Sequence, residues 1–321
     1  MRRALTPAAE WLVADIGGTR LRAAVCGRDT GLREPRVLGC ADYPTPLAAL
    51  AAYLRQVGAR PVAACLAVAG PIGGDLFRFT NSAWQFSQAD LRAALGLERL
   101  VVLNDFEALA LALPALAPRD LRRIGAGAAR VAAPLAVLGP GTGLGLAILV
   151  PHRGEWIAIA GEGGHAGFAP QDEQEIAIAA FLRRASPRVT NESILSGRGL
   201  EALYAALAAL DGVPCEPLAA AQVSARALDG TDARALRAVD VFCAVLGAVA
   251  GDLALIGGAR GGVYIGGGIA PLLLPLLIGS RFRARFEAKA AQHAYVAAIP
   301  TQVIVAQAPA LLGAAAALRA A

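Results

Sequence analysis

The sequence contains no pair of cysteines at the short spacing that metal sites use. Its five cysteines are widely separated along 321 residues, at Cys26, Cys40, Cys65, Cys215 and Cys243. An odd number of distant cysteines argues against a disulfide-stapled scaffold and against a structural zinc site. The pattern predicts reduced, buried thiols and fits the cytoplasm.

Lysine is nearly absent as well. Lys289 is the only lysine among 30 basic residues, so the formal net charge of +5 comes almost entirely from arginine. The arginines are scattered, with short pairs such as Arg122-Arg123 and Arg183-Arg184 and no long basic block. Such pairs are typical of solvated faces, and we expect no nucleic-acid partner.

Two stretches lack charge altogether, at 131–150 and 261–280. Each is long enough to cross a bilayer as a helix. Both contain two prolines and clustered glycines, which do not sustain a helix. We therefore expect buried strands interrupted by functional turns, and no membrane partner. The basic start at residues 1–3 precedes only a short apolar run, so no signal peptide is expected.

Apolar segments alternate with helical patterns, which indicates α/β architecture. Strands are expected first at 11–16, 21–26, 37–39, 61–68 and 100–103, with helices at 47–56 and 106–113. Ser87 followed by Asp90 is an N-cap signature for a short helix that Gly96 would end. After about residue 114 a loop rich in Ala, Arg and Gly restarts the pattern. Strands then follow at 135–138, 144–150, 156–159, 263–265 and 303–306, and helices at 173–184, 199–256 and 309–320.

Two stretches share one construction: an apolar strand, a turn of glycines and a threonine, and a second apolar strand. The first turn is Gly17-Gly18-Thr19, and the second is Gly139-Pro-Gly141-Thr142-Gly143. Glycine turns expose backbone N–H groups, and such a concavity suits an anionic phosphate. A turn of this kind in each half of the chain predicts nucleotide-driven chemistry.

Four acidic residues and one histidine could serve such chemistry. Asp15 ends the first strand, where a carboxylate would need a divalent cation to approach phosphate, so we expect Mg²⁺ held through water. Aspartate also simply favours turns. Asp105 follows Asn104 at the end of a strand, where ligands of open α/β sheets gather and where a carboxylate can accept a hydroxyl proton. The same pair could instead cap the next helix.

Glu162 and His165 flank two glycines, which let small side chains and backbone approach a ligand closely. A carboxylate and an imidazole can each bind hydroxyls, although an isolated histidine is more often structural. Glu192 has no supporting local pattern, and its charge alone indicates an ordinary exposed acid.

Taken together, these motifs resemble those of bacterial glucokinases, in the order found in that family. The matching segments are Asp15-Ile-Gly-Gly-Thr19, Thr80-Asn81-Ser-Ala-Trp84, Leu103-Asn-Asp-Phe106, Gly139-Pro-Gly-Thr-Gly-Leu-Gly145, Gly161-Glu-Gly-Gly-His165, Ile194-Leu-Ser-Gly197 and Gly266-Gly-Gly-Ile-Ala-Pro271. The match runs from about Trp11 to Gly313, which is nearly the whole chain.

The resemblance implies a two-lobed actin-like, ribonuclease H-like sugar kinase fold with its active site in the cleft between the lobes. It implies a small domain of 1–114 with 306–321 and a large domain of 115–305. Asp105 would be the general base, and glucose would be bound by Asn104, Asp105, Glu162, His165 and Glu192. ATP would be bound by Asp15, Gly17, Gly18, Thr19, Gly139, Gly141, Thr142, Gly143, Gly267 and Gly268. A homodimer is implied as well.

Two departures separate this chain from relatives. Arg20 stands where many relatives have asparagine, which leaves the details of nucleotide binding open. The related ROK kinases and repressors carry a cysteine cluster that binds zinc soon after the Gly-His motif. Here the next cysteine after His165 is Cys215, so no zinc is expected. Asp15 also lies too near the start for the helix-turn-helix of those repressors.

The predicted reaction is transfer of the γ-phosphate of ATP to the 6-hydroxyl of glucose, with Mg²⁺ as cofactor. Two alternatives stay open at this stage: a kinase for another hexose or an N-acetylhexosamine, and a non-catalytic sugar sensor on the same fold. The sequence also leaves inorganic polyphosphate open as a donor.

Overall fold

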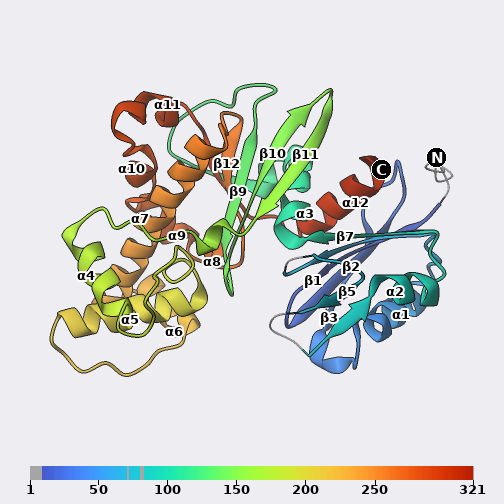
Figure 1. Cartoon of the computed structure of the whole chain (residues 1–321), viewed down its shortest axis with the longest axis horizontal. Helices are drawn as coiled ribbons and strands as arrows, with labels where there is room; N and C mark the ends of the chain where they lie inside the picture. Colours follow the sequence, from blue (N-terminus) through green and yellow to red (C-terminus); the bar gives the residue numbers. More distant parts are fainter. Residues whose placement is uncertain (1–8, 71, 80–82, 321) are drawn as a thin grey trace. The chain divides into compact units, whose positions relative to one another are not determined.

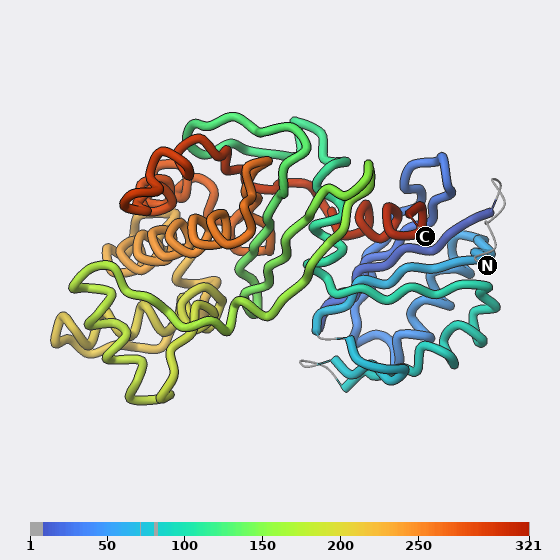
Figure 2. The backbone as a smooth tube through the Cα atoms, turned by 45° about the horizontal axis from the view of Figure 1, so that its top comes forward, coloured from blue at the N-terminus to red at the C-terminus, as the bar shows by residue number. Residues whose placement is uncertain are grey.

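The computed structural model describes residues 9–70, 72–79 and 83–320. The chain divides into two compact units (Figures 1 and 2). Unit 1 comprises Met1–Ala117, His152–Ala158 and Ala306–Ala321, and unit 2 comprises Pro118–Pro151 and Ile159–Val305.

Unit 1 is built on a five-stranded sheet in the order β3-β2-β1-β4-β7. Its strands are β1 (Trp11–Ile16), β2 (Arg20–Cys26), β3 (Arg33–Gly39), β4 (Ala63–Val68) and β7 (Arg99–Asn104). The strand β1 is antiparallel to β2 and parallel to β4, which is parallel to β7. The helices of this unit are α1 (Pro46–Val57), α2 (Gln88–Ala94), α3 (Asp105–Ala112) and α12 (Ala310–Ala320).

Both faces of this sheet are covered, which explains why β1 is apolar at nearly every position. Trp11 and Val13 belong to a cluster with Leu311 of α12. Leu12 belongs to another cluster, with Tyr53 of α1. Because side chains alternate along a strand, a sheet buried on both sides needs apolar residues at odd and even positions alike.

The short helix that the sequence predicts after Ser87 is confirmed as α2. The Ser87 hydroxyl accepts a hydrogen bond from the Asp90 N–H at 3.1 Å, and Gly96 follows the helix with a positive φ of 65°. The hairpin of β5 (Leu76–Arg78) and β6 (Gln85–Ser87) that precedes this helix was not predicted from the sequence. Thr80, Asn81 and Ser82 of the matching motif lie outside the described residues.

Unit 2 is built on a six-stranded sheet in the order β11-β10-β9-β12-β13-β8. Its strands are β8 (Leu121–Ile124), β9 (Leu135–Pro140), β10 (Leu144–His152), β11 (Glu155–Gly161), β12 (Gly262–Ile265) and β13 (Thr301–Ile304). The tip of the β10–β11 hairpin, His152–Ala158, is the part of this sheet that belongs to unit 1. The strand β9 is antiparallel to β10 and parallel to β12, which is parallel to β13. The sheet of unit 1 has the same arrangement around β1, so the two glycine turns occupy equivalent sheet positions.

The expected loop after residue 114 was partly wrong, because it contains β8. This strand lies at the edge of the sheet, antiparallel to β13. Its Arg122 and Arg123 are exposed, and only Ile124 is buried. An edge strand that buries one side chain lacks the apolar alternation by which strands are recognised.

Most helices of unit 2 pack against the longest helix, α7 (Ala233–Ile256). The helices of unit 2 other than α7 are α4 (Glu173–Leu182), α5 (Gly197–Leu210), α6 (Ala220–Leu228), α8 (Ile269–Leu272), α9 (Leu274–Gly279), α10 (Phe282–Glu287) and α11 (His293–Ala297). In the described part of the chain, α7 is the one helix long and apolar enough to span a membrane, but 72% of its apolar window is buried inside the structure. Gly247 and Gly251 of α7 lie against the backbone of α10, which lets the two helices approach closely.

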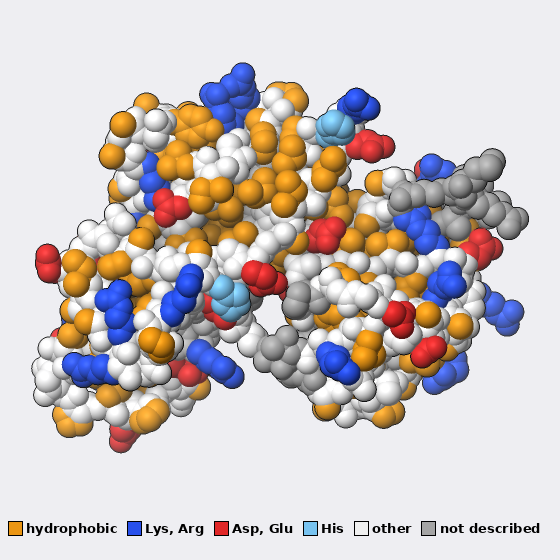
Figure 3. All heavy atoms as spheres, in the orientation of Figure 1, with side chains coloured by type: hydrophobic (Ala, Val, Ile, Leu, Met, Phe, Trp, Pro, Cys, Tyr) orange, Lys and Arg blue, Asp and Glu red, His pale blue; other side chains and the backbone are white. Residues whose placement is uncertain are grey.

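Basic side chains are dispersed over the surface. Figure 3 shows arginine and lysine side chains spread across the visible face, with apolar and acidic side chains between them. Arg122 and Arg123, one of the arginine pairs in the sequence, are exposed on β8.

Candidate active site

The first group of predicted site residues lies at one edge of the sheet of unit 1. In the strand register Ile16 pairs with Val68, and Val68 pairs with Asn104. The carboxyl ends of β1, β4 and β7 are therefore level. Since neighbouring strands are about 5 Å apart, the end of β1 and Asn104 are about 10 Å apart. The first glycine turn and the Asn104-Asp105 pair thus share one edge.

The first turn is closed by few contacts and is open to solvent. The Gly17 N–H donates to the Arg20 carbonyl at 3.0 Å. Cys40, which directly follows β3, supports the turn, because its N–H donates to the Thr19 carbonyl at 3.0 Å and its thiol lies 3.4 Å from the Gly17 carbonyl. Gly18 and Thr19 are exposed. Their N–H groups have no protein acceptor among the residues that the structure describes, so they are available to an anion.

Asp15 has a partner that the sequence analysis missed. Its carboxylate forms an ion pair with Arg22 on β2, at 3.1 Å between Oδ2 and Nη1. Burial raises the pKa of Asp15, and the charge of Arg22 partly opposes that rise. The two residues are direct cross-strand neighbours, a contact that the hairpin register would have indicated.

Asp15 also fits a water-mediated contact to Mg²⁺. Its side chain is 16% exposed, and Oδ1 has no hydrogen-bond partner among the residues that the structure describes. Mg²⁺ commonly keeps several waters and uses one or two carboxylates together with substrate phosphates. The described residues contain no group of three or more His, Cys, Asp or Glu that could hold a metal by themselves.

Asn104 and Asp105 begin α3. Asn104 is the N-cap, and its side-chain oxygen accepts from the N–H groups of Phe106 at 2.9 Å and Glu107 at 3.3 Å. Its amide nitrogen donates to the Gly70 carbonyl at 3.3 Å. Asn104 therefore caps α3, which is the alternative role that the sequence analysis left open for the Asn104-Asp105 pair. These contacts fix the start of the helix and so the position of the half-buried Asp105.

The second turn, in unit 2, is tightly packed. The Gly141 N–H donates to the Gly143 carbonyl at 2.8 Å, and the Gly141 carbonyl accepts from Gly197 at the start of α5 at 2.9 Å. Gly139 lies against the backbone of Gly266 and Gly267, where a Cβ would approach within 2.6 Å. The structure therefore brings the second turn and the Gly266–Gly268 segment together.

The segment that follows β12 depends on glycine for its shape. Gly267 has a φ of 75°, in the left-handed region, and a Cβ there would clash with the Pro140 carbonyl. Gly268 and Thr142 are exposed. Unit 2 thus presents two adjoining glycine segments whose backbone a nucleotide can approach.

The predicted sugar ligands of unit 2 come from two adjacent loops. A short 3₁₀ turn, Gly163–His165, follows Glu162. The Glu192 N–H donates to the Gly164 carbonyl at 2.9 Å, which holds the second loop beside the first. The side chains of Glu162 and His165 are exposed, and Glu192 is partly buried. The structure therefore brings these three residues into one region.

Glu192 also contacts the second turn. Its Oε2 accepts a hydrogen bond from the Leu144 N–H at 2.8 Å. Gly143 lies so close to the same oxygen that a Cβ there would clash with it. Sequence reasoning missed this contact, because the two residues are 48 positions apart and no local pattern joins them.

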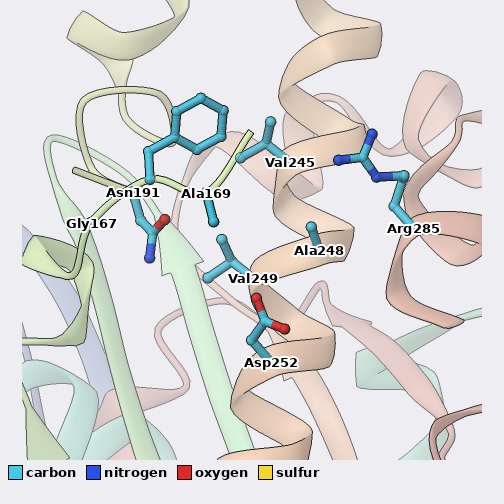
Figure 4. Close-up of a pocket in the computed structure, with 9 residues that line it drawn as sticks. Gly167, Ala169, Asn191, Val245, Ala248, Val249, Asp252 and Arg285 are labelled. Carbon is cyan, nitrogen blue, oxygen red and sulfur yellow. The ribbon is translucent and has the colours of Figure 1, made fainter. Parts of the chain in front are cut away.

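A small cavity lies beside the Glu192 loop (Figure 4). It has a volume of about 40 Å³ and is lined by Gly167, Phe168, Ala169, Asn191, Val245, Ala248, Val249, Asp252 and Arg285. Figure 4 shows Asn191 and Asp252 on opposite sides of the apolar Val249. This volume suits a few water molecules and is too small for a sugar, so we do not assign it to the substrate.

Comparison with known proteins agrees with the motifs. The glucokinase family model matches residues 12–321. A glucokinase from Chromobacterium violaceum is 52% identical over 306 residues, covering 95% of this chain and 88% of the relative. One from Paramagnetospirillum magneticum is 47% identical over 305 residues, covering 94% and 95%.

A solved glucokinase structure from an Antarctic psychrotroph is 37% identical and covers 97% of this chain and 99% of its own, with a TM-score of 0.89. The α/β fold predicted from the sequence, that of the actin-like sugar kinases, is thereby confirmed. A family model that spans nearly the whole chain and relatives at about half identity give one conclusion: the chain belongs to the glucokinase family.

Proposed function

We propose that this chain transfers the γ-phosphoryl group of ATP to the 6-hydroxyl of glucose. The observation that supports this most is that the site motifs are complete: both glycine turns and all five predicted sugar ligands are present and lie in two local groups. Family membership supports the same activity.

In this proposal Asp105 is the general base. The oxygen of the 6-hydroxyl attacks the γ-phosphorus, the bond from that phosphorus to the bridging oxygen of ADP breaks, and the hydroxyl proton passes to the Asp105 carboxylate. The N-cap contacts of Asn104 support this role, because they fix the helix start that carries Asp105. Most of the acceleration would come from positioning and charge stabilisation.

Glu162, His165 and Glu192 would bind the ring hydroxyls together with Asn104. A site built to satisfy many hydroxyls disfavours sugars that lack or misplace one, because its polar groups then stay unpaired. The two exposed side chains and the partly buried carboxylate are available from adjacent loops. This arrangement supports a hexose as the acceptor.

The nucleotide would lie along the glycine segments. The exposed N–H groups of Gly18 and Thr19 would contact phosphate, as would the turn from Gly139 to Gly143, and Gly267 and Gly268 would adjoin the adenosine. Mg²⁺ neutralises charge on the phosphates when bound, and Asp15 would hold it through water. Oδ1 of Asp15, which has no hydrogen-bond partner among the described residues, supports that contact.

A coupled assay tests the proposal. ADP release would be measured with MgATP and a panel of glucose, mannose, fructose, N-acetylglucosamine and N-acetylmannosamine, with polyphosphate as a second donor. We expect the highest kcat/KM for glucose with ATP. Preference for another sugar would reassign the substrate, and glucose binding without ADP release would favour a sensor.

We also propose that the enzyme is a cytoplasmic homodimer. Each chain would have a small domain of 1–114 with 306–321 and a large domain of 115–305. Exposed apolar side chains in unit 2 support an interface there: Ile176, Leu236, Leu272 and Ile278 are each more than 40% exposed. Light scattering after size-exclusion chromatography would measure the mass. A single 32.7 kDa species at micromolar concentration would contradict the dimer.

A further inference from the structure

Glu192 lies between the two substrate regions of unit 2. Its main chain is bound to the sugar loop, through the N–H that donates to the Gly164 carbonyl at 2.9 Å. Its side chain is bound to the phosphate turn, through the Leu144 N–H at 2.8 Å. Among the described residues, no other predicted sugar ligand of unit 2 has a side-chain hydrogen bond with that turn.

The two oxygens of the Glu192 carboxylate have different surroundings. Oε2 accepts the hydrogen bond from the Leu144 N–H and lies where a Cβ at position 143 would be placed. Oε1 has no hydrogen-bond partner in the described part of the chain. A carboxylate accepts hydrogen bonds at both oxygens, so Oε1 can take a sugar hydroxyl while Oε2 holds the turn.

The main chain around Glu192 is also held by hydrogen bonds from the residues that follow it. The Ser196 hydroxyl donates to the Glu192 carbonyl at 2.8 Å, and the Leu195 N–H donates to the Asn191 carbonyl at 2.8 Å. The backbone of Glu192 is therefore fixed, and its side chain is the part free to respond to a ligand.

We propose that Glu192 is a positioning residue that couples the sugar region to the second phosphate turn inside unit 2. This inference rests on the proposed function, since it takes the Oε1 partner to be a sugar hydroxyl. A hydroxyl bound at Oε1 restrains the carboxylate, and the restrained Oε2 orders the Leu144 N–H and the turn before it. The requirement for glycine at position 143 follows, because any side chain there displaces the carboxylate.

A pair of alanine variants in the same turn tests this coupling. In Gly143→Ala the new Cβ would clash with Glu192 Oε2, whereas in Gly141→Ala it meets no atom within 4 Å. Neither glycine has a positive φ, so alanine fits the backbone at both positions. The clash is with the end of a flexible side chain, which can move without unfolding the protein.

Calorimetry would measure glucose binding to the nucleotide-free proteins. We expect Gly143→Ala to weaken binding by about tenfold, the effect of one lost hydrogen bond to a charged group, and Gly141→Ala to bind as the unsubstituted protein does. Equal affinity in all three proteins would overturn the coupling and leave the proposed function intact. Absence of glucose binding by the unsubstituted protein would overturn both.

Hydrogen exchange gives a second readout that needs no variant to fold. The Leu144 amide donates to Glu192, whereas Leu146 lies two residues further along β10, opposite Leu138. We expect glucose, in the absence of nucleotide, to slow exchange at Leu144 severalfold more than at Leu146. Identical exchange at Leu144 with and without glucose would contradict the proposal.

Discussion

The two glycine turns have the same construction but different surroundings. In unit 1, Gly18 and Thr19 are exposed and few contacts close the turn. In unit 2, Gly139 packs on the backbone after β12 and Gly143 packs on a carboxylate. Glycine leaves N–H groups accessible in the first turn, whereas at Gly139 and Gly143 of the second turn neighbouring atoms leave no space for a Cβ. One sequence pattern thus meets two physical requirements.

The two units also differ in the chemistry they hold. Unit 1 has the proposed base, Asp105, at the start of a capped helix. Unit 2 has Glu162, His165 and Glu192 on adjoining loops. If this division is right, substitutions in unit 1 should chiefly affect turnover, and those in the sugar loops of unit 2 should chiefly affect glucose affinity.

The largest expected effect is that of Asp105→Asn. Loss of the general base should lower kcat by about 10²- to 10⁴-fold, while calorimetry should show glucose affinity largely retained because the other ligands remain. Asp90→Asn, at an exposed carboxylate in the same unit, is the matched control and should turn over normally. Comparable kcat for Asp105→Asn and the control would refute the assignment.

The second prediction compares the turns directly. Gly139→Ala places a Cβ against the backbone of Gly266 and Gly267 and should destabilise the protein by about 1–3 kcal/mol. In Gly17→Ala the nearest neighbour is the Arg20 carbonyl at 3.5 Å, an ordinary contact, so stability should change by less than about 1 kcal/mol. Urea unfolding followed by circular dichroism measures both. Equal losses would mean that the turns do not differ in packing.

The third prediction concerns the ion pair beneath the first turn. Arg22→Gln leaves the mostly buried Asp15 carboxylate without its cation. The free energy of unfolding should fall by about 1 kcal/mol at neutral pH, because the partial exposure of Arg22 to solvent weakens the ion pair. Arg22 lowers the pKa of Asp15 against the effect of burial, so its loss should raise that pKa further. The deficit should therefore shrink as the pH falls and the carboxyl becomes protonated.

Urea midpoints at neutral pH and at about pH 4, near the ordinary pKa of aspartate, would measure this dependence. Arg20→Gln is the control, because Arg20 is exposed and no ion pair of its side chain is found among the described residues. A deficit that is the same at both pH values would show that the ion pair does not contribute.

The smallest expected effect concerns the thiols. Burial raises the pKa of Cys26, Cys40 and Cys65 in unit 1, and raises that of Cys243 in unit 2 to about 12. These thiols should stay protonated and unreactive near pH 8. Only Cys215 is partly exposed, so iodoacetamide followed by mass spectrometry should find it modified first. Equally fast modification of Cys40 would mean that the first turn opens readily.

Local patterns in the sequence predicted much of the fold. Both strand–turn–strand units, the cap at Ser87 and the helix at the C-terminal end were recognised because each depends on neighbouring residues. The expected long helical segment at 199–256 contains three helices, since turns interrupt it after Leu210 and Leu228. Strand β8 was missed because its partner lies far along the chain.

The site was predictable in part, for the same reason. The glycine turns and the Asn104-Asp105 pair have local signatures, and the sheet register places them at one edge. The contact of Arg22 with Asp15 follows from the register of one hairpin and was overlooked. The contact of Glu192 with Leu144 depends on tertiary structure, so no local pattern indicates it. The roles of the site residues and the domain boundaries stay predictions.

The most direct test of the central claim is to identify the product of the full-length protein by phosphorus NMR, starting from glucose and MgATP. The account predicts one sugar phosphomonoester, with the phosphorus coupled to the protons on C6, formed in equal amount to ADP. An ATP spectrum that does not change in the presence of bound glucose, or release of inorganic phosphate alone, would contradict it.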